Sequence, residues 1–361
     1  MVEIWRAGMG NTPGSAPAAR AIEAEGWDGQ MFMDSQSLGP DPWTLMGAWA
    51  SATERIKLST GVTNPLTRHP AVTAACAATV QHLSGGRAVL GIGRGDSALA
   101  YLGYAPVGLA AFERSLKDIQ TLLGGGEIPF SGRDADMDAA SLDTLSLGDR
   151  PTGAGLGWLP EDMPKVPLDV AATGPKVIAL SAPIAERVTF SVGAMPERMG
   201  WAIGLADEAR ARAGIASSPS YGAQVIVVCH TDPNYALSFA TSAVAPLARF
   251  QVIQGNAAGP QSGSDEENFT AIRKGYAMTR HGKIGLTKKL VGTSIAPDFV
   301  RRFAIFGTPD HCTERLLELI RCGLERLVIV GPGAYREPEP GLGLFCREVM
   351  PAVRRALAPP G

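Results

Sequence analysis

Eight short β-type runs, each followed by a helical pattern, are the feature that most constrains the fold of this chain. Strands that alternate with helices favour a parallel sheet with right-handed crossovers. The expected strands are residues 2–9, 29–34, 57–62, 87–93, 167–172, 187–192, 222–230 and 324–330. The expected helices are 15–25, one that begins at 41–43, 70–83, 109–123, 175–185, 196–213, 234–250, 308–321 and 344–357.

Eight such units fit a closed barrel better than an open sheet. The main alternative is a doubly wound Rossmann-type sheet, which usually has fewer strands and a nucleotide fingerprint in its first strand-to-helix turn. Residues 9–14, Met-Gly-Asn-Thr-Pro-Gly, form that turn and lack the fingerprint. We therefore predict an α/β fold, a (β/α)8 TIM barrel, with residues 1–361 in one domain.

Two stretches interrupt the alternation. Residues 124–165 are rich in Gly, Asp and Pro, and residues 251–302 are polar at first and then basic. Long irregular segments in a compact domain are usually lids or binding loops, or else disordered. We interpret both as insertions at the C-terminal face of the barrel, on the substrate side.

Composition excludes several classes of function. The net charge of −2 and the scattered charges do not provide the basic face that nucleic-acid binding needs. Five scattered cysteines without a CxxC pair, and histidines without HxH or HExxH spacing, argue against a metal site or a disulfide framework. The chain lacks a signal-peptide pattern and an apolar run long enough for a membrane span, so we expect a cytoplasmic protein with a small-molecule substrate.

Polar residues and glycines gather at the expected strand ends, where TIM barrels place their active groups. The second strand ends in Asp34 and Ser35, the third in residues 61–65, and the fourth in residues 93–97. The run Gly91–Asp96 has GxGxG spacing with Asp in the sixth position, so it is a poor match to a dinucleotide fingerprint. A cofactor contact at a strand end remains open for it.

The fifth and sixth strands end in Thr173–Lys176 and Ser191–Ala194. Glycines there let the backbone approach a ligand, and a following helix N-terminus favours an anion. Two such turns can hold one phosphate between them. The alternative is that both are ordinary short turns, for which Gly and Pro are expected, and composition by itself favours this.

Asp34 and Asp96 follow the second and fourth expected strands and can both face the mouth of the barrel. A carboxylate there can move a proton or orient a polar ring edge. Asp96 precedes Ser97-Ala98-Leu99, however, and a helix N-cap is an equally weighted interpretation of it.

Other candidate groups carry weaker signals. His69 is the histidine that the strand order places near the mouth, whereas His281 lies in the basic insertion and His82 and His311 suit solvated or core positions. Six basic residues form a loose cluster that can meet an anion but is more often a solvated loop. They are Arg273, Lys274, Arg280, Lys283, Lys288 and Lys289.

Residues 61–74, GVTNPLTRHPAVTA, and 83–97, LSGGRAVLGIGRGDS, resemble the bacterial luciferase-like flavin-dependent oxidoreductases. Within that superfamily the chain is similar to the branch that uses the deazaflavin coenzyme F420, notably the methylenetetrahydromethanopterin reductase-like proteins. Residues 170–176 and 185–188 match the second half of its pattern. The resemblance covers most of the chain except the two insertions.

This resemblance implies a (β/α)8 barrel with a non-prolyl cis peptide in a bulge at the end of the third strand, at Gly61–Val62, behind the cofactor ring. It also implies catalytic roles for Asp96, near the ring edge, and for Asp34. The implied phosphate contacts include Gly174 and Gly193. The cofactor contacts expected as a set are Asp34, Gly61, Val62, Thr63, Asn64, Gly93, Arg94, Gly95, Asp96, Thr173, Gly174, Val192 and Gly193.

The activity implied by the resemblance is hydride transfer between coenzyme F420 and an organic substrate. One alternative is an FMN-dependent monooxygenase that receives reduced flavin from a partner reductase, and a second is a non-catalytic flavin-binding protein. Some relatives place a histidine base directly after the second-strand Asp. Ser35 stands there in this chain, a departure that argues against that form of alcohol oxidation. Members of the family are often dimers, so a homodimer is an expected state.

Overall fold

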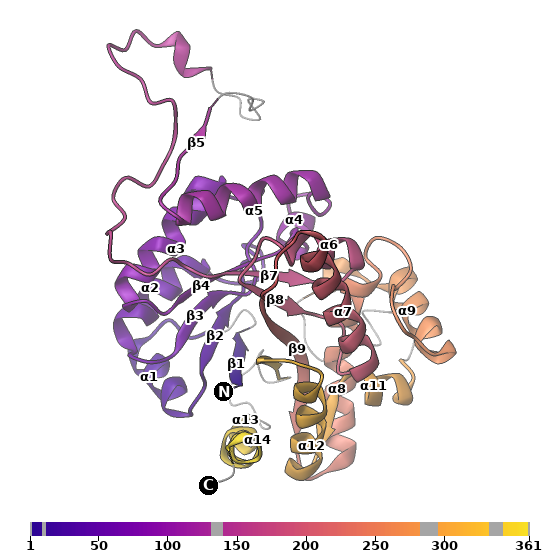
Figure 1. Ribbon diagram of the computed structural model, residues 1–361. Coiled ribbons are helices and arrows are strands. Elements are labelled where there is room, and N and C mark those ends of the chain that lie inside the picture. Colours follow the sequence, from indigo (N-terminus) through magenta and orange to yellow (C-terminus); the bar gives the residue numbers. More distant parts are fainter. Residues whose placement is uncertain (1, 9–11, 131–139, 282–294, 332–341, 360–361) are drawn as a thin grey trace.

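The computed structural model describes residues 2–8, 12–130, 140–281, 295–331 and 342–359. Eight parallel strands of this described part form a closed barrel with helices around it (Figure 1). The strands, in their order around the barrel, are β1 (Glu3–Gly8), β2 (Gly29–Phe32), β3 (Lys57–Thr60), β4 (Ala88–Ile92), β7 (Leu168–Ala172), β8 (Arg187–Phe190), β9 (Ser220–Cys229) and β11 (Arg326–Val330). β11 pairs with β1 and closes the barrel, so the predicted TIM barrel is confirmed.

The helices follow the strands as the sequence predicts. They are α1 (Ala16–Ala24), α2 (Pro42–Ala52), α3 (Pro70–Ser84), α4 (Ser97–Ala100), α5 (Leu109–Leu123), α6 (Pro175–Ser181), α7 (Pro196–Arg212), α8 (Pro233–Ala248), α12 (Pro309–Arg321), α13 (Leu342–Leu344) and α14 (Met350–Leu357). A π-helical turn, Phe345–Val349, joins the last two. The start of α2 shows the local logic, because the Asp41 carboxylate accepts from Thr44 N at 2.8 Å and Pro42 occupies the first turn.

Alternate strand residues contribute to two hydrophobic clusters. Ile4 and Phe32 belong to the cluster between the strands and the helices, whereas Trp5, Met31 and Val89 belong to a second cluster. Residues of the 251–304 region also enter this second cluster. The alternation follows from the two-residue period of a strand. The second cluster therefore packs strand side chains against residues of the second insertion.

A buried ionic network lies where the strands begin. Arg326 of β11 is completely buried, and its guanidinium lies 3.0 Å from the Asp169 carboxylate of β7. Thr189 of β8 accepts from Arg326 at 2.9 Å and donates to Asp169 at 2.8 Å. Arg187, at the start of β8, pairs with Glu3 of β1 at 2.5 Å. These groups tie four strands together at the N-terminal end of the barrel, which in TIM barrels serves stability.

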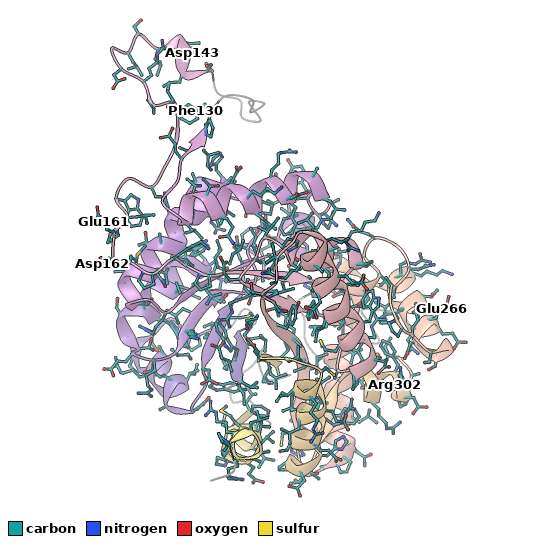
Figure 2. All side chains as sticks on the ribbon, in the orientation of Figure 1. Phe130, Asp143, Glu161, Asp162, Glu266 and Arg302 are labelled. Carbon is teal, nitrogen blue, oxygen red and sulfur yellow. The ribbon has the colours of Figure 1, made fainter. Side chains whose placement is uncertain are left out.

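The structure places the first insertion differently from the expectation that both insertions lie on the substrate side. It joins the end of α5 to the start of β7, and therefore leaves from the N-terminal end of the barrel. Gln81 of α3 donates to Pro164 O at 2.8 Å where the segment returns. Its two-residue strands β5 (Ile128–Pro129) and β6 (Gly153–Ala154) pair, and beyond them the chain extends away from the barrel, carrying Phe130 and Asp143 (Figure 2).

The second insertion lies beside the C-terminal half of the barrel. It contains a 3-10 turn, η2 (Arg249–Gln251), then α9 (Gly263–Gly275), η3 (Met278–Arg280) and α11 (Pro297–Phe303). A further strand, β10 (Ile305–Gly307), then pairs in parallel with the outer end of β9. Phe269 of α9 packs edge-on against Phe299 of α11, with ring centroids 5.1 Å apart. These contacts fix α9, α11 and β10 as a packed layer.

Candidate active site

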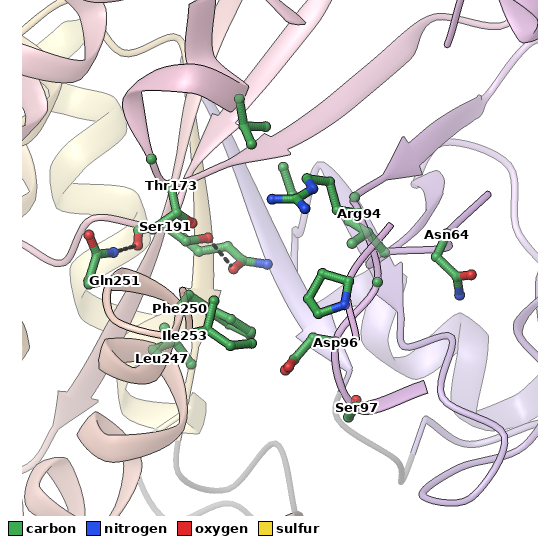
Figure 3. A pocket seen from close by; sticks show the side chains of 18 of the residues that line it. Asn64, Arg94, Asp96, Ser97, Thr173, Ser191, Leu247, Phe250, Gln251 and Ile253 are labelled. Atoms are coloured by element: carbon green, nitrogen blue, oxygen red, sulfur yellow. Dashed lines mark hydrogen bonds between the residues drawn. The ribbon is translucent and has the colours of Figure 1, made fainter. Parts of the chain in front are cut away.

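A cavity of about 500 Å³ opens at the carboxyl ends of the strands (Figure 3). Residues that follow β2, β3, β4, β7 and β8 line it, together with residues of η2 and the segment after it. Its size falls within the range of small-molecule and cofactor sites. The described residues of the first insertion do not line it.

The turn after β3 forms one wall of the cavity. The Gly61–Val62 peptide bond is cis, as predicted, and parallel pairing with β4 resumes at Thr63. Thr63 N donates to Gly91 O at 3.0 Å and Gly93 N donates to Thr63 O at 2.9 Å. A side chain at Gly61 would begin 2.7 Å from the Cβ of Met31, so only glycine fits here. The bulge is therefore held from behind by β2 and from the side by β4.

Asp96 follows the end of β4 and faces the cavity (Figure 3). It occupies the N-cap position of α4, but its side chain makes no capping bond. Its carboxylate instead forms an ion pair with the guanidinium of Arg249 in η2. Of the two interpretations of Asp96, the structure thus favours a cavity group over a cap.

Arg94 connects the same turn to the second insertion. Its Nε donates to Val107 O at 2.6 Å and its Nη1 donates to the Gln254 side chain at 2.7 Å. Asp34, which also lines the cavity, accepts a 2.6 Å bond from Arg68, and Arg68 binds Asp41 at 2.8 Å. The Asp34 carboxylate is therefore held between the cavity and a guanidinium.

Polar side chains also form the opposite part of the wall. Ser191, after β8, donates to the Gln224 side chain of β9 at 2.7 Å. Gln251 donates through Nε2 to the Ser191 carbonyl, a contact visible in Figure 3. Arg198 of α7 is completely buried and donates to Gln251 Oε1 at 2.8 Å and to Ala258 O at 2.9 Å. Arg198 thus positions the loop that carries Gln251.

His281 directly follows η3, is buried and lines the cavity. Its Nδ1 lies 2.5 Å from the hydroxyl of Tyr276. The Arg249 guanidinium lies over the Tyr276 ring, 4.8 Å from its centroid. Burial lowers the pKa of His281 to about 4, with a further decrease from Arg249 that Asp96 partly opposes. The imidazole is therefore neutral near pH 7.

A family model described as luciferase-like monooxygenase matches residues 15–326, which is more than half of the chain. The chain belongs to the luciferase-like monooxygenase family. The resemblance seen in residues 61–74 and 83–97 is thereby confirmed, and the chain is an enzyme of the luciferase-like class.

Curated relatives of this luciferase-like chain agree over most of its length. The 5,10-methylenetetrahydromethanopterin reductase of Methanolobus tindarius is 27% identical over 317 residues, which cover 87% of this chain and 89% of the relative. The F420-dependent glucose-6-phosphate dehydrogenase of Microbacterium testaceum is 27% identical over 341 residues, which cover 91% of this chain and 88% of the relative.

Solved structures show the same fold. The coenzyme F420 dependent tetrahydromethanopterin reductase from Methanopyrus kandleri superposes with a TM-score of 0.73 at 21% identity, over 97% of this chain and 99% of that one. An F420-dependent secondary alcohol dehydrogenase in complex with an F420-acetone adduct gives a TM-score of 0.72 at 18% identity, over 98% and 99%. At these identities the likeness establishes the luciferase-like barrel.

The structure brings most of the predicted site residues of this luciferase-like chain to one cavity. The predicted residues that line it are Asp34, Gly61, Val62, Asn64, Gly93, Arg94, Gly95, Asp96, Thr173 and Gly174. Thr63, Val192 and Gly193 lie outside this lining. Gly193 has a φ of +84°, and a Cβ there would lie 2.7 Å from the Phe303 ring, so its turn is packed against α11.

Sequence reasoning missed the residues that the second insertion and β9 supply, which are Gln224, Arg249, Phe250, Gln251 and His281 as site groups. A polar Gln224 within the apolar strand 222–230 was a usable signal; the others depend on tertiary packing. His69 caps α3, with Nδ1 accepting from Ala71 N at 3.1 Å, and lies outside the cavity lining.

The basic cluster does not line this cavity where the structure describes it. Arg273, Lys274 and Arg280 are exposed, whereas Lys283, Lys288 and Lys289 lie outside the described residues. Within the described ranges, no group of three His, Cys, Asp or Glu side chains is arranged to hold a metal ion. All five cysteines have free thiols. None of the helices in the described ranges is long and apolar enough to cross a membrane.

Proposed function

We propose that this chain is an F420-dependent oxidoreductase that transfers a hydride between the deazaflavin and an organic substrate. The observation that carries the proposal is the cavity bounded by the Gly61–Val62 bulge and the Gly93–Asp96 turn at the carboxyl ends of β3 and β4. The relatives described above support it. The glucose-6-phosphate dehydrogenase of Microbacterium testaceum is named as F420-dependent, and so is the tetrahydromethanopterin reductase from Methanopyrus kandleri. The relative from Methanolobus tindarius is also named as a reductase of a tetrahydromethanopterin compound.

The residues present fit a flat polar ring with an anionic side chain. Asn64 lines the cavity wall, and its Oδ1 accepts from Leu66 N and Thr67 N at 3.0 Å, so it fixes the turn that follows the bulge. A Cβ at Gly174 would meet no heavy atom within 4 Å, which leaves open space beside Thr173 and the exposed Lys176. In our proposal this space takes the phosphate, with Lys176 as its cation.

The wall residues divide the work. The bulge and the Gly93–Gly95 turn support one face and the edge of the ring, and Asp96 lies at the position where a carboxylate can guide a proton at the ring edge. Asp34, held by Arg68, orients the polar end of the pocket. Phe250 and Ile253 line the cavity on the side of the second insertion (Figure 3), where in our proposal they cover the substrate and exclude water. When bound, the deazaflavin supplies a hydride donor or acceptor.

The alternative within the same barrel is FMN with oxygen, as in an FMN-bound Baeyer-Villiger monooxygenase that superposes with a TM-score of 0.64. The test is a pair of binding titrations on the full chain, one with F420 and one with FMN, followed by absorbance. We expect F420 to bind in the micromolar range or tighter. Tighter binding of FMN, with oxygen consumption from its reduced form, would favour the alternative.

A matched pair of glycine variants locates the binding site. Gly174→Trp fills the open space at the end of β7, whereas Gly200→Trp adds the same side chain on an exposed turn of α7 that also has open space around it. We expect the first to weaken F420 binding at least 10-fold and the second to leave it unchanged. If neither cofactor binds the unmodified chain, the proposed function is wrong.

A further inference from the structure

His281 is the histidine that lines the cavity among those in the described part of the chain. Ser35, the position at which some relatives carry a histidine, is buried and accepts a 3.1 Å hydrogen bond from the hydroxyl of Ser97. His69 caps α3, and His230 accepts from Asp232 N at 2.9 Å. An imidazole therefore reaches this cavity from the second insertion and not from β2.

Tyr276 fixes the ring of His281. Its hydroxyl lies 2.5 Å from Nδ1, which leaves Nε2 as the ring nitrogen without a hydrogen-bond partner among the described residues, at the wall of the cavity. The backbone on both sides is also held: Tyr276 N donates to Ile272 O at 3.0 Å, and His281 N donates to Met278 O at 3.0 Å. Tyr101 of the turn after α4 donates to Met278 O at 3.1 Å. The pair is thus anchored to α9 and to the β4 side of the cavity.

Burial and the nearby Arg249 keep the imidazole of His281 neutral, and Asp96 opposes them. Arg249 lies against Tyr276, and its cation disfavours a second positive charge on the imidazole. Asp96, paired with Arg249, has the opposite effect and stabilises an imidazolium when one forms. Burial raises the pKa of Tyr276 to about 12, so its hydroxyl stays protonated. Among the described residues, the charged or titratable groups that act on His281 are therefore the Asp96 carboxylate, the Arg249 guanidinium and the Tyr276 phenol.

We propose that His281 is a catalytic base of this pocket and that the substrate is an alcohol; the inference rests on the proposed function. His281 Nε2 takes the hydroxyl proton of the substrate while the hydride on the same carbon passes to the oxidised deazaflavin. The O–H and C–H bonds break, a C=O bond forms, and the two electrons leave with the hydride. The products are a ketone or aldehyde, the reduced cofactor and an imidazolium that Asp96 and Arg249 surround. Tyr276 is a positioning residue that holds the tautomer with Nδ1–H.

The first test needs no cofactor. Long-range ¹H–¹⁵N NMR spectra of the full chain report the protonation state and tautomer of each of its five histidines, with His281 assigned from His281→Gln. We expect His281 to be neutral at pH 7.5 and to carry its proton on Nδ1, donating it to Tyr276. In Tyr276→Phe we expect this preference to be lost. A proton fixed on Nε2 would overturn the proposal, because that nitrogen would then have no lone pair for a substrate proton.

The second test follows reduction of F420 by a panel of primary, secondary and sugar alcohols. We expect His281→Gln to lower kcat at least 100-fold, with a change in the F420 dissociation constant of less than about 2-fold. His82→Ala, which removes an exposed histidine of α3, is the matched control and keeps wild-type turnover. The acid limb of the pH profile of kcat should be present in the wild type and absent from His281→Gln.

Two results would overturn the inference while leaving the proposed function intact. One is F420 binding with equal kcat for the wild type and His281→Gln. The other is F420 binding without cofactor reduction by any alcohol of the panel. Failure of the wild type to bind F420 contradicts the proposed function instead, and the tautomer of His281 is then judged from the NMR spectra.

Discussion

The carboxylate of Asp96 forms an ion pair with the guanidinium of Arg249, 153 residues further along the chain. The Arg249 side chain is 9% exposed and that of Asp96 is 20% exposed, so the pair is largely shielded from water. Asp96 thus has two tasks: it borders the proposed ring site and it holds the first turn of the second insertion against β4. Any substitution at Asp96 acts on both.

Asp96→Ala is expected to lower turnover far more than cofactor affinity, by about 100-fold against less than about 5-fold. It also leaves the buried Arg249 without its carboxylate, which costs about 1–3 kcal/mol of unfolding free energy. Steady-state kinetics, binding titration and urea unfolding measure the three quantities. The double variant Asp96→Asn with Arg249→Met separates the roles: recovered stability with low turnover supports the catalytic role, and recovered turnover excludes it.

The lowered pKa of His281 predicts an acid-sensitive fold. The pKa of His281 is about 4 in the folded chain, against an ordinary value of 6.5. Between these pH values the imidazole binds a proton in the unfolded chain but not in the folded chain. The unfolding free energy is therefore unaffected by protonation of His281 above pH 6.5, and it decreases as the pH falls from 6.5 towards 4. Between pH 8 and pH 5 the wild type should lose about 2 kcal/mol more unfolding free energy than His281→Gln. Parallel pH dependence of the two proteins in urea unfolding would show that His281 is not shielded as described.

Arg198→Met is expected to loosen the loop after η2 without breaking the barrel. Arg198 donates to Pro260 O at 2.7 Å, to Ala258 O and to Gln251, and these bonds hold the loop against α7. Met keeps much of the buried volume and makes none of them. Amide hydrogen exchange of residues 251–262 should accelerate at least 10-fold, and exchange in β1–β4 should not change. The measured KM should rise more than kcat falls; protection equal to the wild type would contradict this role.

Asp169→Ala tests the ionic network at the other end of the barrel. The substitution leaves the completely buried Arg326 without its anion and removes an acceptor from Thr189. Breaking such a pair usually costs about 3–5 kcal/mol. The urea midpoint should fall accordingly, while F420 affinity of the folded fraction stays within about 2-fold. Asp169→Asn, which keeps an acceptor oxygen, should lose less stability than Asp169→Ala, and the reverse order would contradict this account.

The barrel was readable from the sequence because each strand carries a buried apolar run and each helix has a clear start. Asp41-Pro42 and Thr308-Pro309 mark two of those starts, and the structure confirms both. The Gly61–Val62 bulge was readable only through resemblance, since a cis bond between these two residues leaves no mark in composition. Local patterns thus predicted the scaffold and half of the cavity wall.

The other half of the wall depends on contacts between distant segments. Arg249 stands at the end of the expected helix 234–250 and His281 in a polar stretch, and no local pattern directs either side chain to the cavity. The segment between them packs through the rings of Phe269, Phe299 and Phe303. Gly193 was also misjudged from local sequence. The glycine suggested an open turn for a phosphate, whereas the Phe303 ring occupies the space beside it. The sequence pattern marks a glycine but not the neighbour that requires it.

The pairing of β10 with the outer end of β9 brings together the two ends of the chain segment that contains the second insertion. The chain leaves the barrel after Cys229, and Gly307 at the end of β10 pairs with Cys229. The segment that contains α8, η2, α9 and α11 therefore has its two ends side by side. A segment with adjacent ends can be replaced as a unit by the corresponding segment of a relative. A transplant of residues 230–306 between members of the family would carry the imidazole, the guanidinium and the apolar cover together, and would change which molecules react while the proposed ring-binding rim of β3 and β4 stayed in place.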